Sequence, residues 1–493
     1  CFVMGEIADD LEHIFDALKE GALTMQHGGG VGYDFSPLRP AGMVAHASGT
    51  IASGPVSFMR IWDAMCATML STGARRGAMM ATLACDHPDI ETFIDAKRDA
   101  AELRHFNCSV LVSDAFMRAV AMDADWPLVF AGETQRVVQA RALWTRLMRA
   151  AYDTAEPGVL FVDTINRDNT LAGIESLAAT NPCGEIPLPP YGACDLGSLN
   201  LAAFVRAPFE STATFDHAAL EDATRIAVRL LDDVIDASRY PLPAQAREAH
   251  DKRRVGLGIT GLADALVLLG QRYDSAAARE FAADLMRRVR DAAYRTSVKL
   301  AREKGAFPRF DADAFLASGF AQRLPADIRD VIAAHGIRNS HLLAIAPAGT
   351  ISLLANNVSS GIEPVFAAEA ERRVLGTDGR YTTHRVDDYA CRLWKRLGKS
   401  GLPPAMVEAR QLDPRAHLLM QAALQPCVDN AISKTINVAA ELPFEPFQDL
   451  YREAHALGLK GCTVFRPNPV TGAILSEPAA AERVQCCGIE REA

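Results

Sequence analysis

The sequence has no apolar run of the roughly 20 residues that a membrane-spanning helix needs, so a membrane protein is not expected. It also has no excess of positive charge, because 51 Lys and Arg face 61 Asp and Glu and give a formal net charge of −10. An acidic protein has no long-range attraction for nucleic acid or anionic lipid. We therefore expect neither nucleic acid nor a membrane as a partner.

The sequence also lacks a Cys-x-x-Cys pair, the spacing typical of structural zinc sites, and no metal site is predicted. Its 11 cysteines are an odd number without regular spacing, which argues against a secreted scaffold of disulfides. We expect a soluble cytoplasmic protein, in which a functional cysteine is catalytic rather than structural.

Short apolar runs alternate with longer segments of helical periodicity along the chain. Residues 109–112 and 158–162 are examples of the apolar runs, and amphipathic helices are predicted over 219–237 and 275–303. Strands that alternate with helices indicate an α/β fold with a largely parallel sheet. With 49% apolar residues, the 493-residue chain is long enough to bury a large core.

Three segments stand outside this alternation. The chain starts with Cys1 rather than Met, as a mature lipoprotein does, but the apolar residues 2–4 indicate a buried strand rather than a flexible tether. We therefore expect the natural chain to have a segment before Cys1. Residues 367–385 and the tail after about residue 475 have the least regular pattern, and insertions or mobility are expected there.

Residues 180–201 are the most informative segment. Four prolines and several glycines exclude a helix or a regular central strand, yet the segment is also apolar, so a rigid loop buried inside a larger structure is expected. Asn181, Cys183 and Glu185 alternate, and in an extended backbone they would line one wall of a pocket. The thiol could then act on a substrate while Glu185 accepts a proton and Asn181 holds the substrate. A proline-rich surface loop with an inert buried cysteine is equally compatible with the spacing alone.

Residues 181–185 (Asn-Pro-Cys-Gly-Glu) and 194–201 (Cys-Asp-Leu-Gly-Ser-Leu-Asn-Leu) resemble the finger loop of ribonucleotide reductases. Further matches follow in that family's order between Cys1 and about Pro467, at residues 28–32, 38–40, 75–78, 87–90, 156–158, 254–258, 346–352 and 433–437. The resemblance implies a ten-stranded α/β barrel of two five-stranded parallel halves, with the finger loop threaded through its centre. Residues 1–475 would be the catalytic barrel, with the finger loop at about 180–200, and residues 476–493 a mobile C-terminal tail.

The resemblance also implies roles for five residues. Cys183 would be the thiyl radical that removes hydrogen from the 3′ carbon of the ribose. Glu185 would be the base at the 3′ hydroxyl, and Asn181 would orient the sugar. Cys1 and Cys194 would be the dithiol that becomes a disulfide, because one new S–S bond delivers the two electrons that the reduction needs.

The same resemblance implies three binding or redox elements elsewhere. Asp9 would contact the ribose of an effector nucleotide, and the loop with Arg75 and Arg76 would report which effector is bound and so select the substrate base. Cys486 and Cys487 in the tail would pass electrons to the buried pair, although adjacent cysteines form a strained ring and a remnant of a truncated tail is an equal alternative. The substrate's phosphates would be held by a loop at a helix start, where backbone N–H groups can bind an anion. Its residues are Ala346, Pro347, Ala348, Gly349, Thr350, Ile351 and Ser352.

The phosphate loop departs from the family's pattern at one position. Ala348 stands where the family usually has Thr, so one hydroxyl contact to the phosphates is in doubt. Without the resemblance, an ordinary helix N-cap is the simpler interpretation of this segment.

The source of the radical is predicted by features that the family's other classes require. The oxygen-dependent class passes a radical through two adjacent tyrosines near the end of the barrel, and residues 461–466 (Gly-Cys-Thr-Val-Phe-Arg) contain no tyrosine. The anaerobic class needs a glycyl radical near the C-terminus, and the partial match at residues 373–376 is far from it. The class that remains uses adenosylcobalamin. The sequence has no Asp-x-His-x-x-Gly, so a protein histidine is not expected to replace the lower base of that cofactor.

The resemblance therefore predicts an enzyme that reduces ribonucleotides, with diphosphates as the expected substrates. ATP and deoxynucleotides would be effectors, and thioredoxin or a similar protein would be the reductant. A homodimer is expected through the helix after Asp9 and the helix near Trp62. The rival from another class is a non-catalytic nucleotide-binding subunit or fragment of such a reductase.

A second rival, a nicotinamide dehydrogenase, depends on the Gly-x-Gly-x-x-Gly match at residues 256–261. In a dinucleotide fold this sequence follows an apolar strand, but residues 249–254 are polar and charged. We therefore interpret the match as fortuitous and expect these glycines to serve helix packing.

Overall fold

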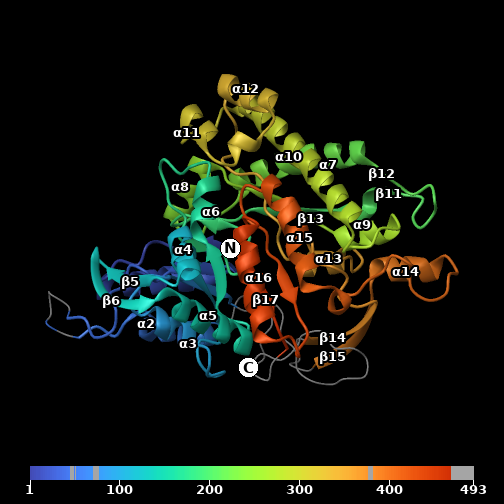
Figure 1. The fold of residues 1–493 in the computed structure, drawn as a ribbon. Coiled ribbons are helices and arrows are strands. Elements are labelled where there is room, and N and C mark those ends of the chain that lie inside the picture. The colour runs from blue at the N-terminus through green and yellow to red at the C-terminus, as the bar shows by residue number, and fades with distance from the viewer. Residues whose placement is uncertain (45–48, 50, 70–76, 376–380, 468–493) are drawn as a thin grey trace.

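The computed structural model describes residues 1–44, 49, 51–69, 77–375 and 381–467 (Figure 1). Helices and strands alternate along the chain, so the predicted α/β class is confirmed. Arg75, Arg76 and the predicted tail with Cys486 and Cys487 lie outside the described residues.

The first part of the chain forms a parallel sheet joined by helices. Residues 2–4, predicted as a strand, begin it, and both predicted apolar runs lie in or overlap its strands. The neighbouring strands, all parallel, are β1 (Phe2–Val3), β2 (Val31–Asp34), β3 (Met79–Ala84), β4 (Phe106–Val112) and β7 (Gly158–Phe161). The connecting helices are α1 (Leu11–Gln26), α2 (Pro55–Thr68), α3 (Ile90–Asp95), α4 (Asp114–Met122) and α5 (Ala140–Thr154).

The second part of the chain supplies the opposite wall. β10 (Leu196–Asn200) pairs in parallel with β13 (Gly256–Thr260). Parallel bridges then join Leu257 to Leu343 and Ile345 to Ile432. Shortly after Ile432, β16 (Thr435–Asn437) pairs in parallel with β17 (Gly461–Phe465). Parallel pairing therefore continues from β10 to β17.

Two long helices cover this second wall. They are α7 (His217–Ala237) and α10 (Ala276–Lys304), and they pack against each other. Their bounds lie within two residues of the predicted 219–237 and 275–303, so both predictions are confirmed.

The two walls meet at two antiparallel junctions. At the first, β17 runs antiparallel to β7. At the second, Phe2 forms an antiparallel bridge with Ala193, shortly before β10. Hydrogen bonds from Val3 N to Gly192 O (3.0 Å) and from Cys194 N to the carbonyl of the first residue (2.9 Å) flank that bridge. Strand pairing can therefore be followed around the molecule from β1 back to β1.

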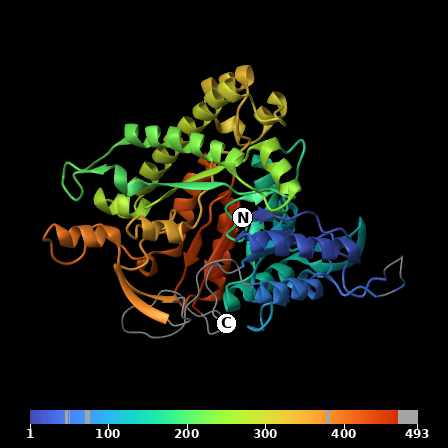
Figure 2. The same cartoon turned by 180° about the vertical axis from the view of Figure 1, so that it is seen from behind.

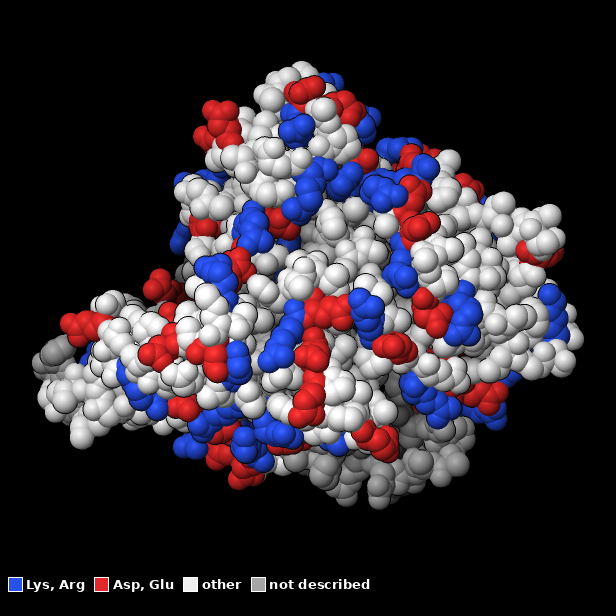
Figure 3. Space-filling view, in the orientation of Figure 1, with Lys and Arg blue, Asp and Glu red and all other residues white. Residues whose placement is uncertain are grey.

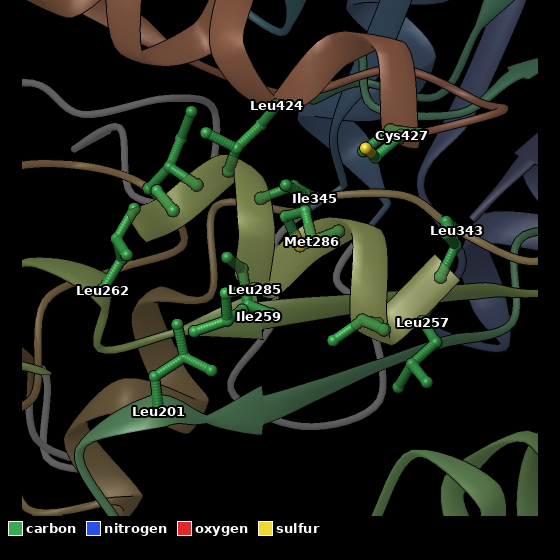
Figure 4. Close-up of a cluster of buried hydrophobic side chains, with 14 of the residues drawn as sticks. Leu201, Leu257, Ile259, Leu262, Leu285, Met286, Leu343, Ile345, Leu424 and Cys427 are labelled. Atoms are coloured by element: carbon green, nitrogen blue, oxygen red, sulfur yellow. The ribbon is translucent and has the colours of Figure 1, made fainter. Parts of the chain in front are cut away.

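Each wall has its own hydrophobic core. In the second wall, Leu257, Ile259 and Leu343 from the strands meet Leu285 and Met286 of α10 (Figure 4). In the core of the first wall, Trp62 lies edge-on to Tyr33 and Phe35. Seen from behind, β16 and β17 lie between the N-terminal part and the middle of the chain (Figure 2).

The remaining elements complete the described part of the chain. They are β5 (Asp125–Phe130), β6 (Glu133–Gln139), α6 (Val162–Asp168), β8 (Ala179–Thr180), β9 (Pro187–Leu188), η1 (Leu201–Phe204), β11 (Val205–Arg206), β12 (Thr214–Phe215), α8 (Pro243–Lys252), α9 (Leu262–Leu268), α11 (Ala312–Ala317), η2 (Ala321–Arg323), α12 (Ala326–His335), α13 (Gly349–Leu354), β14 (Glu369–Leu375), β15 (Tyr381–Asp387), α14 (Tyr389–Arg396), η3 (Ala409–Gln411), α15 (Pro414–Leu424), η4 (Gln425–Cys427) and α16 (Phe444–Ala456).

Residues 367–385, which have no clear pattern in the sequence, contain most of an antiparallel hairpin. Its strands β14 and β15 pair from Glu369–Asp387 to Leu375–Tyr381. The segment is polar and has no apolar run, so only its backbone hydrogen bonds reveal it. On the surface, Lys and Arg are interspersed with Asp and Glu over the face shown in Figure 3. Among the described helices, none has an apolar stretch long enough to cross a membrane.

Candidate active site

Residues 179–188 form a short hairpin that carries the predicted catalytic residues at its tip. Its strands β8 and β9 pair antiparallel. At the tip Gly184 has a φ of +82°, a left-handed conformation that glycine adopts without steric cost, and Gly184 N donates to Asn181 O at 3.0 Å. The side chains of the tip are enclosed, since Asn181 is 1% and Glu185 2% exposed. The segment is therefore buried, as its apolar and proline-rich sequence predicts.

Strands of the first wall hold one side of the hairpin. Thr82 of β3 donates from Oγ1 to Ala178 O at 2.8 Å. Asn107 of β4 donates from Nδ2 to Pro182 O at 2.8 Å. Both acceptors are carbonyls of an irregular buried loop, which need partners because an unpaired buried carbonyl is costly.

The other side of the hairpin contacts the second wall. Ala431 N, next to the bridged Ile432, donates to Glu185 O at 2.9 Å. On the side of the first wall, the hairpin passes so close to β2 that a Cβ on Gly32 would lie 2.0 Å from Thr180 O. Only glycine fits at that crossing. The hairpin therefore lies between the two walls, inside the circuit of strands.

The turn at the tip brings Asn181 and Glu185 into direct contact. Asn181 Nδ2 donates to Glu185 Oε1 at 2.9 Å, and Ile186 N donates to Asn181 Oδ1 at 3.2 Å. The prediction of an extended backbone is wrong here, because residues 182–185 form a turn. The turn, rather than alternation along a strand, places the amide beside the carboxylate and puts Cys183 at the apex.

The Glu185 carboxyl has an unusual affinity for a proton. Burial, reinforced by the negative charge of an ionised Cys194, raises the pKa of Glu185 from an ordinary value of 4.5 to about 7. Its Oε2 atom is buried and has no hydrogen-bond partner among the described residues. A carboxylate oxygen in this state is suited to take a proton from a substrate hydroxyl.

The two predicted redox cysteines lie opposite each other at the antiparallel junction of the walls. Cys194 N donates to Cys1 O at 2.9 Å. Directly opposed residues of this kind have Cα atoms about 5.5 Å apart, within the range that a disulfide spans. The Cys1 thiol also borders the hairpin, because a Cβ on Gly30 would lie 3.1 Å from Cys1 Sγ and 3.0 Å from Pro182 Cγ. Cys1 is therefore close to Pro182, the residue that precedes Cys183.

A cavity of about 160 Å³ reaches Cys183 at the hairpin tip. Its walls include Ser109 of β4, Gly158 of β7 and Thr463 of β17, around the junction of the two walls. A Cβ on Gly158 would lie 3.1 Å from Thr463 Oγ1 and 3.3 Å from Ser109 Oγ. The absence of a side chain at Gly158 leaves two hydroxyl groups facing the space beside it. Nothing in the sequence distinguishes these hydroxyls from those of other strand residues.

The predicted phosphate loop, residues 346–352, lies next to the anchor of the hairpin. Ile345 N donates to Ala431 O at 3.2 Å, and the loop follows directly. The expected helix start is present, since α13 begins at Gly349. Gly349 and Thr350 are exposed, so this helix start is accessible to a ligand.

Asp9, predicted to contact an effector, binds a residue of the chain itself. Arg39 donates from its backbone N to Asp9 Oδ1 at 3.0 Å and from Nε to Oδ2 at 2.7 Å. The contact ties the segment before α1 to the loop at residue 39. The effector role of Asp9 stays a prediction.

The glycines at residues 256–261 do not form a nucleotide-binding turn. Gly256–Thr260 is strand β13 itself, rather than a loop after a strand. The expectation that these glycines serve helix packing is wrong. A Cβ on Gly258 would lie 2.3 Å from Ala344 O, and one on Gly256 would lie 2.9 Å from Ile186 Cδ1. The glycines instead let β13 approach the next strand and the hairpin closely.

A buried polar cluster beside the cavity was not predicted. Lys434, which lines the cavity, contacts Glu363 Oε2 and donates to His417 Nδ1 at 2.8 Å. Burial and the Lys434 charge lower the pKa of His417 to about 2, so the imidazole is neutral and accepts this hydrogen bond. Glu363 Oε1 also accepts from Thr435 N at 2.9 Å. The cluster joins segments that are distant in sequence, so no local motif signals it.

The raised pKa of Glu185 predicts a stability effect that depends on pH. Because the folded-state pKa lies above the ordinary value, stability is lost as pH rises from about 4.5 through about 7. Replacing the group in Glu185→Gln removes this loss. The free energy of unfolding of the variant minus that of the wild type should therefore increase by about 2 to 3 kcal/mol from pH 5 to pH 8. Urea unfolding at both pH values measures the gain, with Glu133→Gln on the exposed strand β6 as the control. An equal difference at both pH values would contradict the account.

Comparison with known proteins identifies the family. Residues 1–465 match the family model described as ribonucleotide reductase, barrel domain. A vitamin B12-dependent ribonucleoside-diphosphate reductase of Mycobacterium tuberculosis is 41% identical, over 97% of this chain and 69% of that protein. A protein of the same name from Thermoplasma acidophilum is 35% identical, over 97% of this chain and 62% of its own length. The chain therefore belongs to the ribonucleotide reductase family, and residues 1–465 correspond to the family's α/β barrel domain.

Proposed function

We propose that this chain reduces ribonucleoside diphosphates to 2′-deoxyribonucleotides by a thiyl radical on Cys183, with adenosylcobalamin as the radical generator. The observation that carries the proposal is the hairpin tip, where Cys183 borders a cavity and lies beside the buried pair of Asn181 and Glu185. The relatives from Mycobacterium tuberculosis and Thermoplasma acidophilum are named vitamin B12-dependent ribonucleoside-diphosphate reductases, which supports both the cofactor and the diphosphate substrate.

In this proposal the circuit of strands is a ten-stranded barrel, and the hairpin is the finger loop at its centre. The contacts of the hairpin with Gly32, Thr82, Asn107 and Ala431 on the surrounding strands support a central position. One parallel half would consist of β1, β2, β3, β4 and β7, and the other of β10, β13, residues 343–345, β16 and β17.

Each of the three residues at the tip has a different role in the first steps of the reaction. The Cys183 radical removes the hydrogen atom from the 3′ carbon of the ribose. Glu185 takes the proton of the 3′ hydroxyl, for which its free Oε2 and its pKa near neutrality are suited. Asn181 fixes Glu185 through the 2.9 Å hydrogen bond and orients the sugar. At the end of the cycle Cys183 returns a hydrogen atom to the 3′ carbon.

Cys1 and Cys194 supply the reducing equivalents. The 2′ carbon–oxygen bond breaks and the hydroxyl leaves as water. The two thiols give up two hydrogen equivalents and become one disulfide, so electrons and protons balance. The antiparallel pairing that opposes these residues supports the assignment. In the cytoplasm, thioredoxin or a similar dithiol would restore the pair, with Cys486 and Cys487 as candidates to pass on the electrons.

The residues around the cavity fit a cofactor that acts on Cys183. The hydroxyls of Ser109 and Thr463 beside Gly158 would hold a sugar-bearing group at the wall, because hydroxyls can both donate and accept hydrogen bonds. Adenosylcobalamin, when bound, supplies an organic radical by cleavage of its cobalt–carbon bond. The described lining has Phe465 and no tyrosine, which is compatible with a radical that does not arrive through a tyrosine relay.

Binding of the phosphates, the effectors and a second subunit completes the proposal. The exposed start of α13 would hold the phosphates, and Asp9 and the loop with Arg75 and Arg76 would respond to ATP and deoxynucleotides. A homodimer would form through α1 and α2. Leu11 is 63% and Phe15 50% exposed one turn apart on α1, which supports this face of the helix as the contact.

The proposal predicts reduction of labelled CDP by the purified chain with dithiothreitol, only when adenosylcobalamin is present. Cys183→Ser should lower the rate by at least about a thousandfold while it leaves the fold intact, because the hydroxyl of serine is a far poorer hydrogen donor to a radical. Product analysis and circular dichroism measure the two effects, and CTP in parallel shows the preferred phosphate state. Cofactor binding without any product would favour the alternative, a non-catalytic nucleotide-binding subunit.

The redox assignment predicts a different defect for Cys194→Ser. Without a second thiol opposite Cys1, the disulfide between residues 1 and 194 cannot form. At most one product per active site should therefore appear. Rapid-quench measurement of product against enzyme concentration tests this. The control is Cys391→Ser, at a buried cysteine of α14 outside the site. Multiple turnovers in Cys194→Ser would remove Cys194 from the redox role.

A further inference from the structure

A tyrosine in the turn before Cys194 is bonded to helix α1. Tyr191 Oη donates to Glu20 Oε2 at 3.1 Å. The tyrosine ring lies against the segment that follows β1, where a Cβ on Gly5 would be 2.4 Å from Tyr191 Oη and 2.5 Å from Tyr191 Cζ. The side chain is thus fixed between the end of the finger segment and α1, with glycine making room for it.

The backbone at Tyr191 is in a conformation that needs such support. Its φ is +64°, in the left-handed region that residues with a Cβ seldom adopt. The next residue, Gly192, closes the turn by donating its N–H to Pro189 O at 2.9 Å. A non-glycine residue persists in this region when surrounding contacts hold it there. The hydrogen bond to Glu20 and the packing against Gly5 are such contacts.

The turn leads directly into the pairing of the redox cysteines. Val3 N donates to Gly192 O at 3.0 Å, and two residues later Cys194 N donates to Cys1 O at 2.9 Å. The position of Cys194 relative to Cys1 therefore depends on the turn that Tyr191 holds. Helix α1, which carries Glu20, is also in close contact with β2, because a Cβ on Gly21 would lie 1.9 Å from Tyr33 Oη.

We propose that Tyr191 is a positioning residue for the redox pair: through its hydrogen bond to Glu20 it holds Cys194 opposite Cys1 and so ties formation of the disulfide to α1. The inference rests on the proposed function for the redox role of the two cysteines. It adds a residue to which the proposed function assigns no role. It also connects the redox pair to the helix whose opposite face exposes Leu11 and Phe15.

The disulfide equilibrium tests this without any turnover. The full chain is equilibrated with mixtures of reduced and oxidised dithiothreitol, so that two protein thiols become a disulfide as the cyclic disulfide of the reagent becomes a dithiol. Alkylation of the remaining thiols and mass spectrometry of the Cys1–Cys194 peptides give the equilibrium constant. In Tyr191→Phe only the phenolic hydroxyl is lost. The equilibrium constant should fall roughly three- to tenfold, because without the hydrogen bond the turn that holds the two thiols opposite each other is no longer ordered in the reduced chain and must become ordered when the disulfide forms.

Two further variants separate positioning from general loss of stability. Tyr152→Phe is the matched control. Tyr152 lies on α5, is partly buried like Tyr191, and donates from Oη to Leu442 O at 2.7 Å. It should leave the Cys1–Cys194 equilibrium unchanged. Glu20→Ala should reproduce Tyr191→Phe, and the double variant should be no worse than either single variant, because both remove one shared interaction.

The outcomes distinguish this inference from the proposed function. An unchanged equilibrium in Tyr191→Phe, an equal shift in Tyr152→Phe, or additive effects of Tyr191→Phe and Glu20→Ala would each overturn the positioning role while the redox assignment stands. A wild-type chain that forms no disulfide between Cys1 and Cys194 in any buffer would overturn both. A shift confined to Tyr191→Phe and Glu20→Ala, without additivity, supports the inference.

Discussion

The crossing of the hairpin at residues 179–188 over β2 is the constraint on which the candidate site depends. The carbonyl of Thr180 lies where any side chain at Gly32 would begin, so the hairpin and the sheet are in backbone contact. An irregular loop buried at this depth must find partners for its own carbonyls, and Thr82, Asn107 and Ala431 supply them from strands of both walls. The tip is therefore fixed by the strands around it, and Cys183 is presented at one defined place.

The same burial sets the chemistry of the tip. Because water is excluded, the Glu185 carboxyl holds its proton up to a pH of about 7, and the nearby Cys194 strengthens this effect when it is ionised. The hydrogen bond from Tyr191 to Glu20 connects the turn before Cys194 to α1, a helix with exposed apolar side chains, so the paired cysteines, the hairpin and this helix share one set of contacts.

Local sequence predicted the parts of this structure that local physics determines. The long amphipathic helices α7 and α10 were predicted within two residues, and the prolines of residues 180–201 predicted a buried, irregular loop. The alternation of Asn181, Cys183 and Glu185 predicts an extended backbone with the three side chains on one wall, whereas a turn around Gly184 brings Asn181 into contact with Glu185. The cluster of Glu363, His417 and Lys434 and the contact of Tyr191 with Glu20 join distant segments, and only the closed circuit of strands brings such residues together.

The central claim is that Cys183 is the residue that exchanges hydrogen with the radical generator. The most direct measurement uses adenosylcobalamin tritiated at the 5′ carbon of its adenosyl group and follows the release of tritium into water. A thiol that exchanges its hydrogen both with that carbon and with solvent predicts release by the wild type. Cys183→Ser should bind the cofactor and release none. Equal release by Cys183→Ser would contradict the account, because hydrogen exchange would then not pass through the thiol at the tip of the finger.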